Sequence, residues 1–148
     1  MPNWVTNKLI FKNHEDTHRV FRLMWWHNKR FSFKSIIPHP TTEEECEAKH
    51  LIRNSDPFYQ GTEKKPWFNW YTWHVQHWGC KWDCSDTIGF DNTIKFQTPW
   101  DPPCDELLQA IADKFQVEFT IKAWDEMEDE EKEPTKFQKR TFKPMKAE

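Results

Sequence analysis

The residues best suited to chemistry lie close together, in the sequence His74-x-x-His77-x-x-Cys80-x-x-x-Cys84. Imidazole nitrogen and thiolate sulfur are ligands that Zn²⁺ prefers, and structural zinc sites use short spacings between them. The spacing is a poor fit, however, because Cys80 follows the expected end of a helix and Cys84 falls in an expected strand. We therefore expect no metal and no cofactor, with two histidines on an aromatic helix and two buried thiols.

Catalysis would need a nucleophile beside a general base. The same cysteines and histidines, or a carboxylate group formed by Asp83 and Asp86, are the only candidates. No nucleophile elbow or phosphate-binding loop occurs, and the chain has only three glycines. We therefore expect a protein that is not an enzyme. We expect Asp86 to be a structural acceptor for an indole N–H or for backbone donors.

These residues belong to a stretch, 67–82, around which the chain is organised. It holds five of the ten tryptophans, and their spacing predicts an amphipathic helix that Gly79 ends. So much aromatic surface must be buried against the core or against a partner. We expect three of these tryptophans in the core: Trp70, Trp78 and Trp82. Exposure is left open for Trp25, Trp26, Trp67 and Trp100.

The periodicities along the chain predict one domain over residues 1–124. The expected order is a strand at 4–11, a helix at 15–28 capped by Asn13, an insertion at about 30–79, a hairpin of strands 82–90 and 94–98, a helix capped by Asp101 with Pro102 in its first position, and a strand at 117–123. This is the βαββαβ pattern of a ferredoxin-like α+β sandwich, with helices on one face of an antiparallel sheet.

The hairpin is predicted from a change to a period of two. Residues of even number from Trp82 to Phe90, among them Ile88, are expected to face the core. Asp91-Asn92 supplies the turn.

The composition limits the function classes. The chain has 148 residues and a net charge of −3, which gives no electrostatic case for nucleic acid or an anionic membrane. No signal peptide or membrane-spanning stretch is recognisable, so we expect a cytoplasmic protein whose four cysteines are reduced.

The tail at 125–148 separates its charges, with seven acids in 125–133 and five bases after them. We expect a solvated, mobile tail. The alternative is that Phe137 and Phe142 pin its basic half to the sheet or to a partner.

Five short motifs occur in the order seen in one protein family. They are Met1-Pro-Asn-Trp4, Phe31-Ser-Phe-Lys-Ser-Ile-Ile-Pro-His-Pro40, Trp70-Tyr-Thr-Trp73, Trp78-Gly-Cys-Lys-Trp82 with Asp86, and Thr98-Pro-Trp-Asp-Pro-Pro103. Over about residues 1–124 the chain resembles the YubB-like ferredoxin-like domain family of bacteriophages and conjugative plasmids. The charged tail departs from the glycine-containing end of that family, and Cys80 and Pro99 also depart from its pattern.

The resemblance implies a ferredoxin-like core, a bacterial intracellular setting and an origin in a mobile element. It implies no established catalytic activity. It also implies structural roles for the motif residues, which are Trp4, Pro38, Trp70, Tyr71, Trp73, Trp78, Gly79, Lys81, Trp82, Asp86 and Pro103.

We therefore expect a phage or mobile-element accessory protein that binds and inhibits a host bacterial protein, such as a CRISPR effector or another anti-phage component. The alternative is a nucleic-acid-binding module, for which the basic half of the tail is the main argument. The sequence leaves the target open, and both a monomer and a homodimer fit it. The candidate partner-binding residues are Trp25, Trp26, Trp67, Trp100, Lys139 and Arg140.

Overall fold

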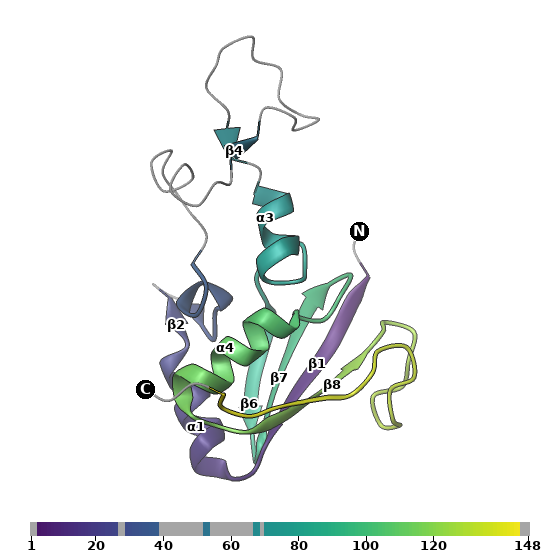
Figure 1. The fold of residues 1–148 in the computed structure, drawn as a ribbon. Coiled ribbons are helices and arrows are strands. Elements are labelled where there is room, and N and C mark those ends of the chain that lie inside the picture. The colour runs from purple at the N-terminus through teal and green to yellow at the C-terminus, as the bar shows by residue number, and fades with distance from the viewer. Residues whose placement is uncertain (1–2, 27–28, 39–51, 54–66, 69, 146–148) are drawn as a thin grey trace.

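The computed structural model describes residues 3–26, 29–38, 52–53, 67–68 and 70–145. Its centre is a five-stranded sheet in the order β6-β7-β1-β8-β9, antiparallel throughout. Helices α1 and α4 pack on one face of this sheet (Figure 1). The main elements are β1 (Trp4–Phe11), α1 (His14–Leu23), β6 (Ser85–Phe90), β7 (Thr93–Pro99), α4 (Asp105–Phe115), β8 (Phe119–Trp124) and β9 (Arg140–Phe142).

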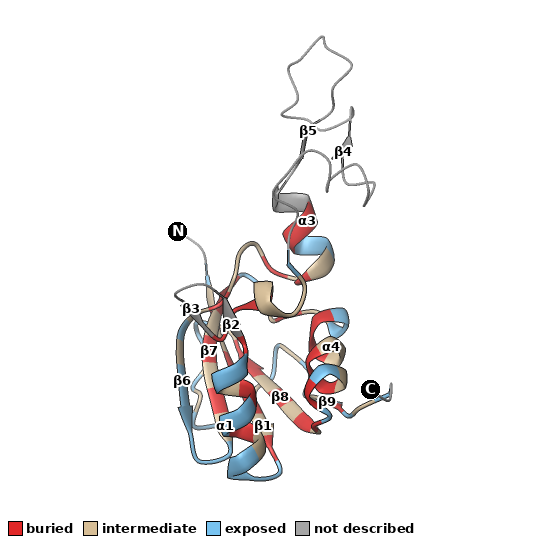
Figure 2. Cartoon of the chain, turned by 90° about the vertical axis from the view of Figure 1, so that its left-hand side faces the viewer, coloured by how far each residue is buried: buried red, intermediate tan, exposed pale blue. Residues whose placement is uncertain are grey.

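The ferredoxin-like order predicted from the sequence is confirmed. Strand β1 lies between β7 and β8, and its residues alternate between half-buried and buried positions. The buried positions, which include Val5 and Leu9, face the helices together with Ile94, Phe96 and Ile121 from the neighbouring strands (Figure 2). Within the described residues, no helix is long and apolar enough to cross a membrane.

Helix α1 begins as predicted and ends earlier than predicted. The Asn13 side chain accepts a hydrogen bond from the Asp16 N–H at 2.8 Å and caps the first turn. The helix stops at Leu23, not at residue 28, because Met24 accepts a backbone hydrogen bond from Ser32 (2.8 Å). The chain then forms a short hairpin of β2 (Trp25–Trp26) and β3 (Lys29–Arg30). Tertiary pairing here overrides the helical periodicity.

Helix α4 carries the predicted apolar stripe but not the predicted cap. Its N-cap is Cys104, so Asp101 and Pro102 lie outside the helix. The reason is that Pro102 precedes Pro103, and a residue before proline is pushed out of the helical region. The buried stripe of the helix consists of Leu107, Leu108, Ile111, Ala112 and Phe115.

The predicted tryptophan helix is α3 (Trp70–His77). It ends as expected at Gly79, which has a φ of 85°. Trp78 is fully buried, and its Nε1 donates to the Ile37 carbonyl at 2.9 Å. Its own carbonyl accepts from the Cys104 N–H at 2.9 Å. Trp78 therefore ties the insertion to the start of α4.

Two other tryptophans were expected in the core with Trp78. Trp82 is half-buried against Trp4, with ring centroids 6.0 Å apart. The side chain of Trp70 lies outside the description. The other parts of the insertion that the structure describes are a 3₁₀ turn (Phe33–Ser35), β4 (Ile52–Arg53) and β5 (Trp67–Phe68).

The tail differs from the expected solvated segment. Strand β9, in its basic half, pairs with β8 through Phe119↔Phe142, Thr120↔Thr141 and Ile121↔Arg140. Phe142 is buried, and its ring lies 5.7 Å from that of Phe119. The structure thus follows the alternative in which Phe142 pins the tail to the sheet, and the sheet extends past residue 124.

The acceptor role expected of Asp86 belongs to Asp83. The Asp83 carboxylate accepts hydrogen bonds from the Phe33 N–H (2.9 Å), the Cys84 N–H (2.8 Å) and the Ser32 hydroxyl. It therefore fixes the 3₁₀ turn against the start of β6. Asp86 is exposed, and it contributes through its backbone, which has a φ of 51°.

The first prediction compares these two aspartates. Asp83→Asn should lower the free energy of unfolding by about 1–3 kcal/mol, because hydrogen bonds to a charged acceptor are lost in a half-buried place. Asp86→Asn should change it by less than about 0.5 kcal/mol, because asparagine also tolerates a positive φ. Urea unfolding followed by tryptophan fluorescence measures both. Equal losses would contradict the assignment to Asp83.

The second prediction compares two glycines. A Cβ at Gly79 would lie 2.5 Å from the Cys104 nitrogen, on a backbone that already has a positive φ. Gly79→Ala should therefore lower the free energy of unfolding by more than about 2 kcal/mol. Gly89→Ala is the matched control, because its Cβ would meet the Phe21 ring only at 3.4 Å. Its effect should stay below about 1 kcal/mol, and thermal unfolding of the two variants tests the difference.

Candidate functional site

In the second half of β6, the residues of even number face away from the core, which is the opposite of the prediction. Ser85 pairs with Gln97, but the next pair is Ile88↔Lys95, so β6 has one more residue than β7 in this interval. Such a bulge moves every later side chain to the other face. Ile88 and Phe90 therefore share the open face of the sheet with Lys95, and they are 53% and 43% exposed. The expectation that they face the core was wrong.

This strand also forms one edge of the sheet. It pairs with β7 on one side, and no strand in the described part of the chain pairs with its other side. Every second residue of an antiparallel edge strand turns its N–H and C=O outward, away from its neighbour. The edge of β6 therefore offers backbone donors and acceptors next to two exposed apolar side chains.

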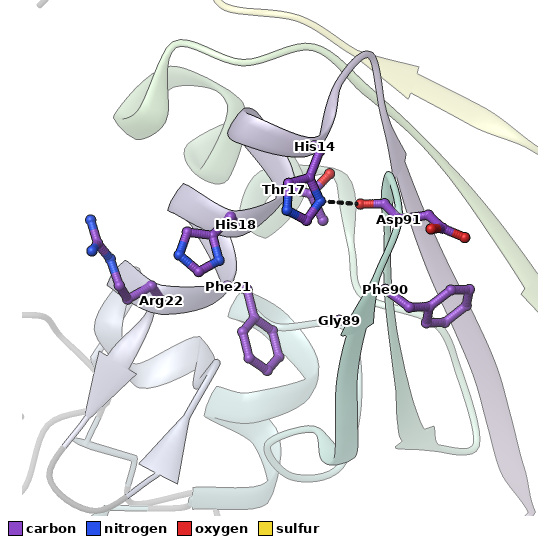
Figure 3. A pocket seen from close by; sticks show the side chains of 8 residues that line it. All are labelled: His14, Thr17, His18, Phe21, Arg22, Gly89, Phe90 and Asp91. Atoms are coloured by element: carbon purple, nitrogen blue, oxygen red, sulfur yellow. Dashed lines mark hydrogen bonds between the residues drawn. The ribbon is translucent and has the colours of Figure 1, made fainter.

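A groove of about 420 Å³ separates this edge from α1. Figure 3 shows its walls, which are α1 on one side and the end of β6 with the following turn on the other. Its lining residues are His14, Thr17, His18, Phe21, Arg22, Gly89, Phe90 and Asp91. A side chain at position 89 would approach the Phe21 ring to 3.4 Å, so glycine leaves the ring in close contact with the strand.

The polar side chains that line the groove are Thr17, two histidines, Arg22 and Asp91. His14 and His18 lie one turn apart on α1, with ring centroids 6.1 Å apart. His14 Nδ1 lies 3.0 Å from the Asp91 carbonyl oxygen, whereas the Asp91 carboxylate points away from both histidines (Figure 3). Arg22 continues the same face of the helix and is exposed. Its side chain points away from Gly89 and Phe90 (Figure 3).

The four weak zinc candidates are engaged in packing and hydrogen bonds. His74 stacks on Trp78 at 4.3 Å, and its Nδ1 lies 2.7 Å from the Lys81 carbonyl. His77 Nδ1 lies 3.4 Å from the Glu106 carboxylate. No group of three or more His, Cys, Asp or Glu residues suited to a metal occurs among the residues that the structure describes.

The three cysteines that the structure describes are buried or half-buried. Cys84 is fully buried, and its thiol donates to the Phe31 carbonyl at 3.0 Å. Burial, reinforced by the charge of Asp83, raises the pKa of the Cys80 thiol well above its usual range. Burial also raises the pKa of Cys104. A thiol that stays protonated is a poor nucleophile and a poor metal ligand.

The structure describes the side chains of three of the six partner-binding candidates chosen from the sequence. Trp100 is 47% exposed, with a φ of 70°. Lys139 is exposed, whereas Arg140 pairs with Asp105 and donates to the Pro103 carbonyl at 2.8 Å. Trp25 and Trp26 belong to β2 and Trp67 to β5, and the side chains of all three lie outside the described residues.

The sequence analysis also did not predict the row of lysines on the open face of the sheet. Three lysines lie directly opposite one another across three strands, in the register Lys95↔Lys8↔Lys122. Acids of the tail neutralise both ends of this lysine row: Glu130 pairs with Lys95 at 2.8 Å and Glu133 with Lys122 at 2.7 Å. Lys8 lies over the Trp124 ring, 5.1 Å from its centroid.

Trp124 anchors the same part of the tail. It is buried, and its Nε1 donates to the Lys132 carbonyl at 2.7 Å. The face that an RNA-recognition domain would use for stacking bases is thus occupied in part by the chain's own acidic segment.

Comparison with known proteins supports the fold. Residues 77–132 match the family model of a ferredoxin-like domain in Api92-like protein. This match agrees with the ferredoxin-like order of the strands and helices described above. The matched residues include β6, β7, α4 and β8, and with them the edge strand. No curated protein and no solved structure matches the chain.

The third prediction concerns the pH dependence of the tail contacts. The hydrogen bond from Lys122 holds the pKa of Glu133 below its usual range, and that from Lys136 does the same for Asp125. A carboxyl group whose pKa is lower in the folded state stabilises the fold above its unfolded pKa. That stabilisation is lost as the pH falls through the folded pKa.

The free energy of unfolding should therefore fall between about pH 5 and pH 3, and it should fall less in Glu133→Gln than in the unsubstituted protein. Glu131→Gln, at an exposed acid of the same segment, is the control and should keep the full dependence. Urea unfolding at a series of pH values gives the slopes. Identical slopes for all three proteins would show that the contact between Glu133 and Lys122 does not contribute.

Proposed function

We propose that the protein is a binding module that captures an extended segment of a partner protein along the outer edge of β6. The observation that carries this proposal is the combination of an edge with which no described strand pairs and two apolar side chains, Ile88 and Phe90, turned outward beside it. Addition of a strand to an exposed sheet edge is a recurrent mode of peptide recognition. Backbone hydrogen bonds supply affinity in that mode, and side-chain contacts supply specificity.

The size of the apolar contribution supports the proposal. Fully burying an isoleucine or phenylalanine side chain stabilises a complex by about 1.5–3 kcal/mol. A few such anchors usually dominate an interface. Ile88 and Phe90 are already half covered, so burying the remainder gives less than this maximum, and the backbone bonds of the edge must contribute the rest.

The class of partner is proposed from the setting that the sequence suggests. The resemblance to YubB-like proteins of phages and conjugative plasmids favours a host bacterial protein as the target, with inhibition as the outcome of binding. A component of an anti-phage defence, such as a CRISPR effector, fits that setting. The protein would act there without catalysis and without a cofactor, by occupying a surface that the host protein needs.

Nucleic-acid binding is less well supported. The chain has a net charge of −3, and tail glutamates pair with two lysines of the lysine row. Arg140, in the basic half of the tail, is also paired, with Asp105. Phosphate binding would have to displace these acids, which weakens the electrostatic term that dominates nucleic-acid affinity.

The fourth prediction tests the edge. The tagged protein should retain a host protein from bacterial lysate after nuclease treatment. The double variant Ile88→Lys with Phe90→Lys should lower the amount of retained host protein by at least about nine tenths. Both positions are exposed, so the fold should persist, which circular dichroism checks. Trp100→Lys is the matched control, because this aromatic side chain is exposed to a similar extent but lies away from the edge.

Two results would overturn the proposal. Retention that is lost with Trp100→Lys and kept in the edge variant would place the interface at one of the candidates chosen from the sequence. Retention that disappears with nuclease would move the function to nucleic-acid binding.

A further inference from the structure

The lysine row crosses three adjacent strands on the open face of the sheet, the side away from α1 and α4. At the usual spacing of strands it spans about 10 Å. Two residues further along, the same face carries the uncharged row Thr93↔Ile10↔Thr120. Strand pairing therefore does not require a charge on this face, whereas like charges directly opposite one another destabilise a sheet. The lysine row needs an anion.

The segment 125–133, which we call the acidic strap, supplies that anion. Its residues Glu130 and Glu133 pair with the two outer lysines of the row at 2.8 Å and 2.7 Å. The strap holds seven acids and one lysine, so it carries several negative charges spaced along one chain. Its carboxylates stand where the phosphates of a bound nucleic acid would stand, because both are anionic oxygens that a lysine ammonium group binds.

The ion pairs between the strap and the row are exposed. The Glu133 side chain is 74% exposed and that of Glu130 is 39% exposed. Ion pairs of this kind contribute little to stability and are screened by salt. The strap is shaped by separate contacts, among them the Glu128 carboxylate, which accepts from the Lys136 N–H at 2.9 Å. A polyanion can therefore displace the two glutamates without unfolding the strap.

The open face also offers an aromatic ring beside the row. Ile88 lies level with the row because it pairs with Lys95, and Phe90 lies two residues further along β6 on the same face. Phe90 is 43% exposed. Proteins that bind single-stranded nucleic acid combine lysines that hold the phosphates with aromatic side chains on which bases stack. The combination favours a single strand over an acidic protein segment, which has no bases to stack.

We propose that the open face of the sheet is a binding surface for single-stranded nucleic acid, and that the acidic strap is its internal competitor. Glu130 and Glu133 hold the outer lysines until phosphates displace them, so the strap lowers the affinity for nucleic acid. This inference does not rest on the capture of a strand by the edge of β6. It adds a second surface and a second class of partner to the proposed function.

Removal of the two competing charges tests the proposal. The probe is a fluorescein-labelled oligothymidylate of about twelve nucleotides, and its binding to the full chain is measured by fluorescence anisotropy. The double variant Glu130→Gln with Glu133→Gln should bind at least about tenfold more tightly than the unsubstituted protein at about 50 mM salt. The slope of log K against log salt should be steeper by about 1.4, which is about 0.7 for each of two added phosphate contacts.

The matched control makes the same change of net charge elsewhere in the strap. Glu126→Gln with Glu131→Gln removes two acids that are exposed, and it should raise the affinity by less than about threefold. Circular dichroism checks that both double variants keep the fold.

A further pair of variants locates the contact. Lys8→Gln, at the centre of the row, should remove most of the gain when it is added to the Glu130 and Glu133 double variant. Lys143→Gln, added in the same way, should preserve the gain. Lys143 is exposed, and its carbonyl accepts from Gln109 of α4 at 2.7 Å, away from the row.

Three results would overturn the proposal. Equal affinity of the unsubstituted protein and the Glu130 and Glu133 double variant would show that the strap does not compete. Equal gains in the two double variants would assign the effect to net charge alone. A labelled polyglutamate peptide that binds the Glu130 and Glu133 double variant as tightly as the oligothymidylate would assign the open face to an acidic protein segment. The lysate experiment tests the edge separately, because it is carried out after nuclease treatment.

Discussion

Antiparallel pairing places each residue of β6 on the same face as its partner in β7, and the extra residue at the bulge decides which face that is. With Asp86 in the left-handed region, Gly89 falls on the helix side opposite Ile94, and Ile88 falls on the open side opposite Lys95. Phe21 of α1 can then pack against Gly89. The groove, the outward orientation of Ile88 and Phe90, and the close contact of Phe21 with Gly89 all depend on this bulge.

The charge arrangement of the open face depends on the same register. Like charges directly opposite one another in a sheet are destabilising, and the lysine row places three of them side by side. The acidic half of the tail compensates by pairing with the two outer lysines, and the aromatic end of β8 holds that segment in place through the Trp124 indole. The charge separation along the tail therefore has a structural cause: its acids neutralise the sheet, and its basic half supplies β9.

Much of the core could be predicted because its signals are local. The alternation in β1, the apolar stripe of α4, the Asn13 cap and the terminating Gly79 each follow from spacing or from the conformational preference of one residue. The missed features depend on contacts between distant segments. The end of α1 is set by Ser32, the role of Asp83 by the 3₁₀ turn 50 residues earlier, and the burial of Phe142 by pairing with β8. No periodicity within a short window contains these contacts.

The sequence analysis missed the candidate site because the only signal in this stretch, its period of two, predicts that the apolar side chains are buried. A strict period of two over 82–90 places Ile88 and Phe90 inside, and only an inserted residue turns them out. Natural sheets protect their edges with short strands or with charged side chains. The opposite edge of this sheet does both, since β9 has three residues and begins with Arg140. The edge of β6 ends in Ile88, Gly89 and Phe90 without a charge among them, so it lacks the side chains that would prevent another strand from pairing there. In the described part of the chain, the bulge between Ser85 and Ile88 is the main device that protects this edge from pairing, and the three residues after the bulge are where we propose that a partner strand binds.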